Sequence, residues 1–156
     1  MKRLLITALV WLGVCSSTTI EPRSVWNAAH TMIYTVTTVR IERALKGQRS
    51  GSITVTQMGG RLDGIQTKVA GVRQFDAGER AALFLRPSVD MPGTYVITGL
   101  MQGRFTIAST NGKEVATNGV GGVTTYDRST GELHEFSGAA MPLQELESRV
   151  KRAGRQ

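Results

Sequence analysis

Apolar and polar residues alternate along most of this chain, in short runs that end at glycine or proline. In the longest run, Ile33, Val39 and Leu45 share one parity, and Arg40 and Glu42 share the other. Alternation with a period of two residues is typical of a strand that buries one face and exposes the other. We therefore expect a long strand here whose outer face is exposed to solvent toward its C-terminal end.

Glycine-marked turns divide the chain into further strands. Lys46-Gly47 ends the first strand, because glycine readily adopts the left-handed backbone conformation. Residues 52–58 alternate in the same way and predict a hairpin with that strand. Asp63-Gly64 offers a turn in a weaker strand segment, and Asn111-Gly112 is a strong signal for a second hairpin turn.

The most apolar run outside the N-terminus follows a polar, glycine-containing turn. The segment Ala70–Leu85 reads A-G-V-R-Q-F-D-A-G-E-R-A-A-L-F-L. A run of this length bounded by turn residues predicts a buried strand, here over residues 81–85, which the turn sets in register. The residues that we expect to build this turn and strand are Phe75, Gly78, Glu79, Leu83, Phe84 and Leu85.

Residues 141–153 carry a helical pattern instead. Pro142 suits a first helical turn, and Leu143, Leu146 and Val150 recur at helical spacing. We expect one amphipathic helix of about three turns that docks on the strands.

These elements indicate a mainly β domain. Five to seven short strands and one terminal helix predict a small OB-like β-barrel, partly open, with the helix at its C-terminal end. An immunoglobulin-like sandwich is the alternative, although the chain has no Cys…Trp…Cys arrangement. We expect the barrel domain to span residues 31–137, to end in an exposed hairpin built from 123–126 and 133–136, and to follow a linker over 18–30.

Residues 1–17 have the layout of a secretory signal peptide. Lys2 and Arg3 precede an apolar run from Leu4 to Cys15, and small polar residues follow. The run is too short to anchor the chain across a bilayer. We expect cleavage between Val14 and Thr19 and export to the periplasm or the extracellular space.

Two alternatives stand beside a cleaved signal. Leu12-Gly13-Val14-Cys15 resembles a bacterial lipobox, which would make Cys15 the lipidated first residue of a membrane-anchored lipoprotein. Alternatively, residues 9–17 form the first strand of the domain, and Met1 is an internal position of a longer coding sequence. Cys15 is the single cysteine, so no disulfide can form within the chain.

Charge and composition narrow the possible partners. The formal net charge is +7, and cations gather near the C-terminus between Arg149 and Arg155. We expect a basic, solvated surface, with an unknown protein or an envelope polyanion as partner. Aromatic residues such as Phe84 and Phe105 fall within apolar alternation, which is typical of a core, so nucleic acid is not expected.

No familiar catalytic or metal-binding motif is present in the sequence. His30 and His134 lie outside any His/Cys cluster, and Glu132 with His134 predicts a polar surface pair. No serine has a G-x-S-x-G context. We therefore expect no metal, no cofactor and no catalytic residue.

Asp76 and Glu79 are the nearest approach to a carboxylate pair. A structural role explains both: Asp76 holds the turn through hydrogen bonds to the backbone, and Glu79 pairs with Arg80 or a neighbour where the strand begins.

Three groups of residues resemble a known family. They are Ile33-Tyr34-Thr35 with Leu45-Lys46-Gly47, Phe75-x-x-Gly78-Glu79 with Leu83-Phe84-Leu85, and Gly99 followed by Gly103-Arg104-Phe105. The pattern resembles a family of secreted bacterial proteins of uncharacterised function. It is also distantly similar to the netrin-like OB-fold of the tissue inhibitors of metalloproteinases.

The resemblance covers residues 33–107 and implies fold more than function. In the inhibitor class an N-terminal cysteine reaches the protease metal, and Cys15 is the one residue that matches. No second cysteine is present to fix it by a disulfide. We expect a secreted or envelope-associated, non-catalytic binding domain; a metalloprotease-inhibitor-like module and an enzyme of unrecognised type are the alternatives.

Overall fold

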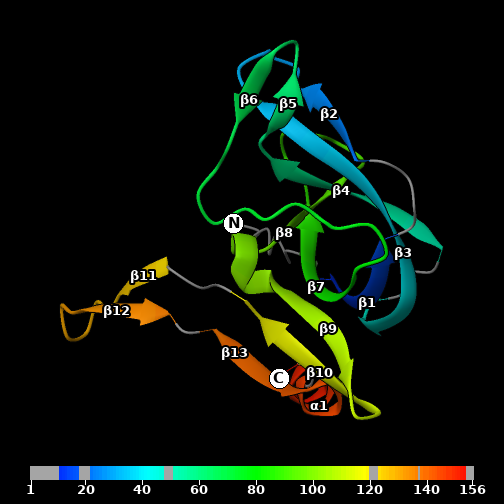
Figure 1. Ribbon diagram of the computed structural model, residues 1–156, viewed down its shortest axis with the longest axis vertical. Helices are drawn as coiled ribbons and strands as arrows, with labels where there is room; N and C mark the ends of the chain where they lie inside the picture. The colour runs from blue at the N-terminus through cyan, green and yellow to red at the C-terminus, as the bar shows by residue number, and fades with distance from the viewer. Residues whose placement is uncertain (1–10, 18–21, 48–50, 120–122, 137, 154–156) are drawn as a thin grey trace, which may run out of the picture.

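The computed structural model describes every residue except 1–10, 18–21, 48–50, 120–122, 137 and 154–156. For residues 11–17 it describes the backbone alone. The described chain is mainly β, with one α-helix at the C-terminal end (Figure 1). The main sheet contains β1 (Trp11–Ser17), β2 (Arg23–Trp26), β3 (Ile33–Lys46), β4 (Ser52–Met58), β7 (Arg80–Pro87), β8 (Tyr95–Ile97), β9 (Arg104–Thr110), β10 (Lys113–Asn118) and β13 (Ala139–Pro142).

Four further strands form two separate hairpins. They are β5 (Gly60–Leu62) with β6 (Ile65–Thr67), and β11 (Val123–Tyr126) with β12 (Leu133–Phe136). The second pair is the exposed hairpin that the sequence predicts, and it projects away from the main sheet in Figure 1. A short 3₁₀-helix, η1 (Leu100–Gly103), and the helix α1 (Leu143–Ala153) complete the fold.

The main sheet curls strongly without closing into a barrel. Its strands lie in the order β1-β3-β4-β8-β7-β9-β10-β13, and β1 also pairs with β7. The link between β4 and β8 is one parallel residue pair, Val55 with Tyr95. Beyond β7 the sheet continues through β9, β10 and β13, so it is large and partly open. The mainly β class, the partly open sheet and the C-terminal helix are confirmed.

The long strand β3 confirms the alternation at its far end and departs from it elsewhere. Val39 and Ile41 are buried while Arg40 and Glu42 are exposed, but both faces are buried over residues 33–37. Two register shifts against β1 each leave an extra residue in β3 near its end, Glu42 and Leu45. Such bulges exchange the faces of a strand.

The shifted register changes where the end of β3 packs. Ile41 belongs to the first of two hydrophobic clusters, whereas Leu45 packs against the second. Leu45 thus lies apart from the residues whose parity it shares in the sequence.

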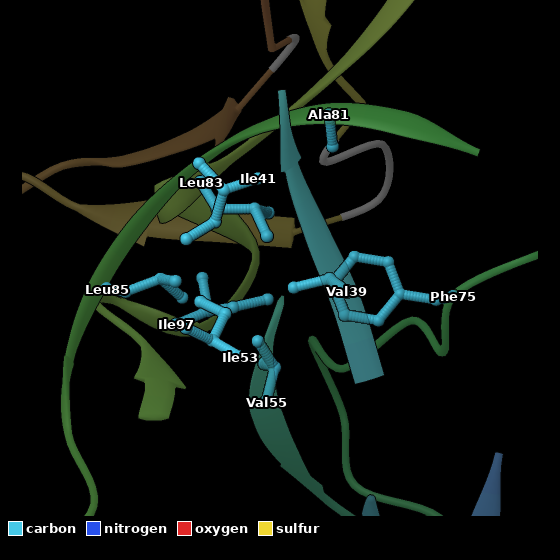
Figure 2. Packing of buried hydrophobic residues seen from close by; sticks show 9 residues of the cluster. All are labelled: Val39, Ile41, Ile53, Val55, Phe75, Ala81, Leu83, Leu85 and Ile97. Carbon is cyan, nitrogen blue, oxygen red and sulfur yellow. The ribbon is translucent and has the colours of Figure 1, made fainter. Parts of the chain in front are cut away.

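Residues 76–79 form the turn before β7, here called the central turn, and the strand that follows it is buried on both faces. Leu83 and Leu85 of β7 enter the first cluster, and Ala82 enters the second. This explains the unbroken apolar run, since a strand between two cores has no wet face. Figure 2 shows the first cluster, which consists of Val39, Ile41, Ile53, Val55, Phe75, Ala81, Leu83, Leu85 and Ile97.

The helix α1 closes the second cluster. Leu143 and Leu146 are buried there, together with Ile107 and Ala116 from β9 and β10. Glu147 is buried as well and forms an ion pair with Arg43 of β3. The sequence places Glu147 on a polar face, but the ion pair allows it to be buried.

Several turns confirm their sequence signals. Asp63-Gly64 and Asn111-Gly112 both have positive φ angles at both residues, as a two-residue hairpin turn requires. Within the described residues, strand β2 occupies part of the segment expected to be a linker. Residues 141–142, expected to begin the helix, belong to β13 instead, because they pair with Val115 and Ala116 of β10.

We predict that Leu83→Ala lowers the free energy of unfolding by about 2–5 kcal/mol, because the side chain is fully buried and its removal leaves a cavity. Leu133→Ala is the matched control: Leu133 is 71% exposed on the β11–β12 hairpin, and a change within about 0.5 kcal/mol is expected. Denaturant titration measures both. Equal losses for the two variants would contradict the assignment of Leu83 to the core.

Candidate functional site

A cavity of about 400 Å³ lies on the side of the sheet where β4 and β8 meet. Thr56, Gln57 and Met58 of β4 line it, as do Val96 and Ile97 of β8. The segment 71–73, η1, and the beginning of β9 supply the other walls. The volume falls within the range that small-molecule sites occupy in proteins.

One part of the cavity wall is apolar and adaptable. Met58, Val72, Val96, Leu100 and Met101 contribute to it. Methionine side chains are flexible and adjust to ligands of different shape. Leu100 has a φ angle of 57° and is 42% exposed, so a leucine is held in a left-handed conformation with its side chain uncovered. Such backbone strain is concentrated at functional sites.

The polar part of the wall converges on one backbone carbonyl. Gln57 donates from Nε2 to the carbonyl oxygen of Arg73 at 2.8 Å, and Arg104 donates from a guanidinium nitrogen to the same oxygen at 2.6 Å. Gln57 and Arg104 are 7% and 6% exposed. Two buried side chains from distant strands therefore meet at the segment that precedes the central turn.

Each of these two side chains keeps one buried atom without a hydrogen bond. The Oε1 atom of Gln57 has no partner among the described residues, and neither has Nε of Arg104. Buried polar atoms in proteins are nearly always hydrogen-bonded, and an unpaired one costs about 1–3 kcal/mol. Both atoms are covered by the cavity wall, so a molecule inside reaches them only when the wall adjusts.

A buried ion pair holds this wall in place. Glu79, at the end of the central turn, pairs with Arg104 of β9, and both side chains are 6% exposed. Glu79 also accepts hydrogen bonds from Arg73 at 2.7 Å and from Thr106 at 3.0 Å. Its other oxygen accepts from the backbone N–H of Asp76 at 3.1 Å.

These contacts determine the charge state of the pair. Burial on its own raises the pKa of Glu79, but the hydrogen bonds from Arg104 and from the Asp76 backbone outweigh it and hold the pKa below the usual range. Burial lowers the pKa of Arg104, and the bond to Glu79 opposes that change. An arginine side chain remains protonated at any pH at which the protein is folded.

The network corrects one expectation about the turn. Glu79 pairs with Arg104 and Arg73 instead of Arg80, because its side chain turns inward while Arg80 binds Glu42 and Glu114. Phe75 lies under the Arg104 guanidinium, whose central carbon is 4.3 Å from the ring centroid.

A second polar pair lines the cavity. Tyr34 of β3 donates from its hydroxyl to Asp90 at 2.9 Å. Burial is the main cause that raises the pKa of Tyr34, and the negative charge of Asp90 adds to it. The hydroxyl therefore stays protonated at neutral pH and continues to donate its hydrogen bond to Asp90.

The other residues selected from the sequence have structural positions. Gly47, Gly78 and Gly99 have positive φ angles at the end of β3, in the central turn and before η1. A Cβ atom on Gly103 would lie 2.2 Å from the Thr98 carbonyl oxygen, so that turn needs glycine. Lys46 is the last residue of β3.

The two aromatic residues expected in the core and the predicted polar surface pair can both be located in the structure. Phe84 and Phe105 pack with ring centroids 6.1 Å apart in the second cluster. His134 and Glu132 lie 3.5 Å apart and are both exposed, which confirms the polar surface pair. The side chain of Cys15 lies outside the described part of the chain.

Sequence reasoning missed the residues that form the cavity. Gln57, Arg73 and Arg104 lie in three separate segments, and no motif connects them. The one available signal was an arginine between Gly103 and Phe105, at the start of a strand that buries its first residue.

Comparison with known protein families, curated proteins and solved structures finds no match for this chain. Within the described residues, no group of three or more potential metal ligands is present. The helix α1 has 11 residues, and no described helix is long and apolar enough to cross a membrane.

We predict that Glu79→Gln lowers the free energy of unfolding at neutral pH by about 3–5 kcal/mol, because it leaves the Arg104 charge buried without its carboxylate. The matched control is Asp76→Asn in the same turn. The Asp76 side chain is 76% exposed, so the loss of its ion pair with Arg73 is expected to cost at most about 1 kcal/mol.

The same variants give a pH test. The lowered pKa of Glu79 means that its contribution is complete above the unfolded value of about 4.3 and is lost as pH falls through the lower folded value. Wild-type protein and Asp76→Asn should therefore lose stability below about pH 4.3, and Glu79→Gln should lose less. Parallel curves for all three proteins would contradict this assignment.

Proposed function

We propose that this chain is a non-catalytic binding domain that holds a small, partly apolar ligand in the cavity between β4, β8 and η1. The observation that carries the proposal is the cavity of about 400 Å³, whose wall includes two buried polar side chains, Gln57 and Arg104, that each keep one unpaired atom among the described residues. Because each unpaired atom is costly, a bound group that satisfies both gains affinity from its hydrogen bonds.

The two atoms favour a ligand group of a particular kind. Gln57 Oε1 accepts a hydrogen bond, and the Nε–H of Arg104 donates one. An amide carries both a donor and an acceptor, so it complements this pair. The neighbouring methionine, valine and leucine side chains suit an aliphatic group next to the amide.

We also propose that this partly open sheet is OB-like. The OB-fold is a five-stranded, partly open barrel whose open face and loops bind ligands. In support, β1, β3, β4, β8 and β7 pair in succession, and β7 pairs again with β1. The cavity lies beside β4 and β8, the two neighbouring strands of this series that are joined by a single residue pair.

We predict that N-acetyl-leucine amide, a neutral probe with an amide and an aliphatic group, shifts the methyl signals of Met58 and Met101 in a saturable way. Titration followed by methyl NMR measures this. Met101→Trp fills the cavity and should abolish the shifts of Met58. The matched control is Ile65→Trp, on an exposed position of β6 outside the cavity, which should bind as the wild type does.

Two outcomes would contradict the binding proposal. One is the absence of any shift up to the solubility limit of the probe. The other is equal binding to Met101→Trp and to the wild type, which would place the probe elsewhere.

Export and envelope association form a separate proposal that rests on the N-terminal pattern. Two cations, an apolar run and small polar residues support it. In the structure, Trp11–Ser17 pairs as β1 with both β3 and β7, as the first-strand alternative proposes. Cleavage between Val14 and Thr19 would remove most of this strand.

Intact-mass measurement of the protein from its native cell tests export. Export with a cleaved signal predicts a mature chain that begins between Cys15 and Thr19, and the lipoprotein alternative predicts the added mass of lipid on Cys15. A full-length, soluble chain would contradict export and support the first-strand alternative. The metalloprotease-inhibitor alternative depends on the same cysteine and would fail if the mature chain begins after it.

A further inference from the structure

Of the three arginines in the cavity wall, Arg86 is the one with no ion-pair or hydrogen-bond partner for its side chain among the described residues. It lies near the end of β7, lines the cavity, and is exposed. Among the described residues, no side chain forms a hydrogen bond or ion pair with its guanidinium. Arginine presents a planar fork of donors that matches the two oxygens of a carboxylate.

The other two arginines of the cavity are already neutralised. Arg73 pairs with Asp76 and Glu79, each at 2.7 Å, and Arg104 pairs with Glu79. Their charges hold the central turn against β9, so they are committed to the protein itself. Arg86 differs from them because its charge is available to a molecule in the cavity.

Asp90 is the one carboxylate among the described residues of the wall, and it does not lie within ion-pair distance of Arg86. One of its oxygens accepts a hydrogen bond from the Tyr34 hydroxyl at 2.9 Å. Tyr34 thus provides a hydrogen bond to this acid, and the Arg86 guanidinium retains its capacity for an anion.

We propose that Arg86 binds a carboxylate of the ligand, so that the cavity takes an aliphatic amino acid acylated on its nitrogen and carrying a free carboxylate. This rests on the proposed function, in which Gln57 and Arg104 bind the amide and the apolar wall binds the side chain. Arg86 adds the third point of recognition. The same chemistry occurs in an N-acyl amino acid and at the C-terminus of a peptide.

The experiment compares two probes that differ in one group. N-acetyl-leucine carries the carboxylate, and N-acetyl-leucine amide is its neutral equivalent. We expect the acid to bind about tenfold more tightly to the wild-type protein, which is the lower end of the range for a hydrogen bond to a charged group. Isothermal titration calorimetry and the methyl signals of Met58 and Met101 measure both affinities.

Arg86→Gln should remove the preference for the acid and leave the affinity for the amide unchanged. The matched control is Arg61→Gln, which changes the net charge equally but lies on β5 outside the cavity. It should keep the tenfold preference. Arg86→Lys keeps the charge without the fork and should retain only part of the preference. It provides a second variant if Arg86→Gln does not fold.

Each result separates the two proposals. If neither probe binds the wild type, the proposed function itself fails. If both bind equally, the carboxylate proposal fails while the binding domain stands. An equal loss of preference in Arg86→Gln and Arg61→Gln would show a general attraction of the basic protein for anions, and it would also overturn the role of Arg86.

The two sources of this chemistry can be distinguished with longer probes. N-octanoyl-leucine extends the acyl side, and the tripeptide Ala-Ala-Leu extends the chain as a peptide does. We expect each to lose affinity when its carboxylate is converted to an amide. The probe that binds more tightly than N-acetyl-leucine identifies the source, and loss of the carboxylate preference in both would overturn the proposal.

Discussion

The buried ion pair between Glu79 and Arg104 is the interaction on which the cavity depends. It connects the turn before β7 to the first residue of β9, and it brings the Arg104 side chain against the carbonyl of Arg73. Removing two charges from water is expensive, and the pair is tolerated because additional hydrogen bonds satisfy both groups. An apolar pair would fill the same space without fixing the position of a backbone carbonyl. The ion pair therefore contributes geometry to the cavity wall as well as stability.

Local patterns were sufficient to predict most of the strands. The alternation in β3 and β4, the hairpin turns at Asp63-Gly64 and Asn111-Gly112, and the helical spacing from Leu143 onward each reflect interactions between residues close in sequence. Strand β10 was harder to identify because it carries few apolar side chains, and β13 because pairing with β10 outweighs the helical signal at Met141 and Pro142. The face of Leu45 also escaped prediction, since a bulge depends on the partner strand.

The site was less predictable than the fold for a physical reason. A buried arginine is normally excluded from a core, so sequence patterns assign Arg104 to a surface. Its burial becomes favourable only when Glu79, which lies 25 residues earlier, meets it in three dimensions. Gln57 likewise looks like one more polar residue of an alternating strand until the Arg73 carbonyl is placed beside it. Pairing between distant segments created the site, and no spacing within one segment records it.

The single residue pair between β4 and β8 has a consequence for access to the cavity. Most other neighbours in the main sheet are joined by three or more residue pairs, so separating them breaks several backbone hydrogen bonds together. At Val55 and Tyr95 there is one backbone pair, to which the Thr56 hydroxyl adds a hydrogen bond to the Tyr95 carbonyl. Local opening of a protein follows the path that loses the fewest such bonds. This seam is therefore the part of the cavity wall where the backbone opens at the lowest cost, and the packing of Ile53, Val55 and Ile97 in the first cluster is what holds it shut.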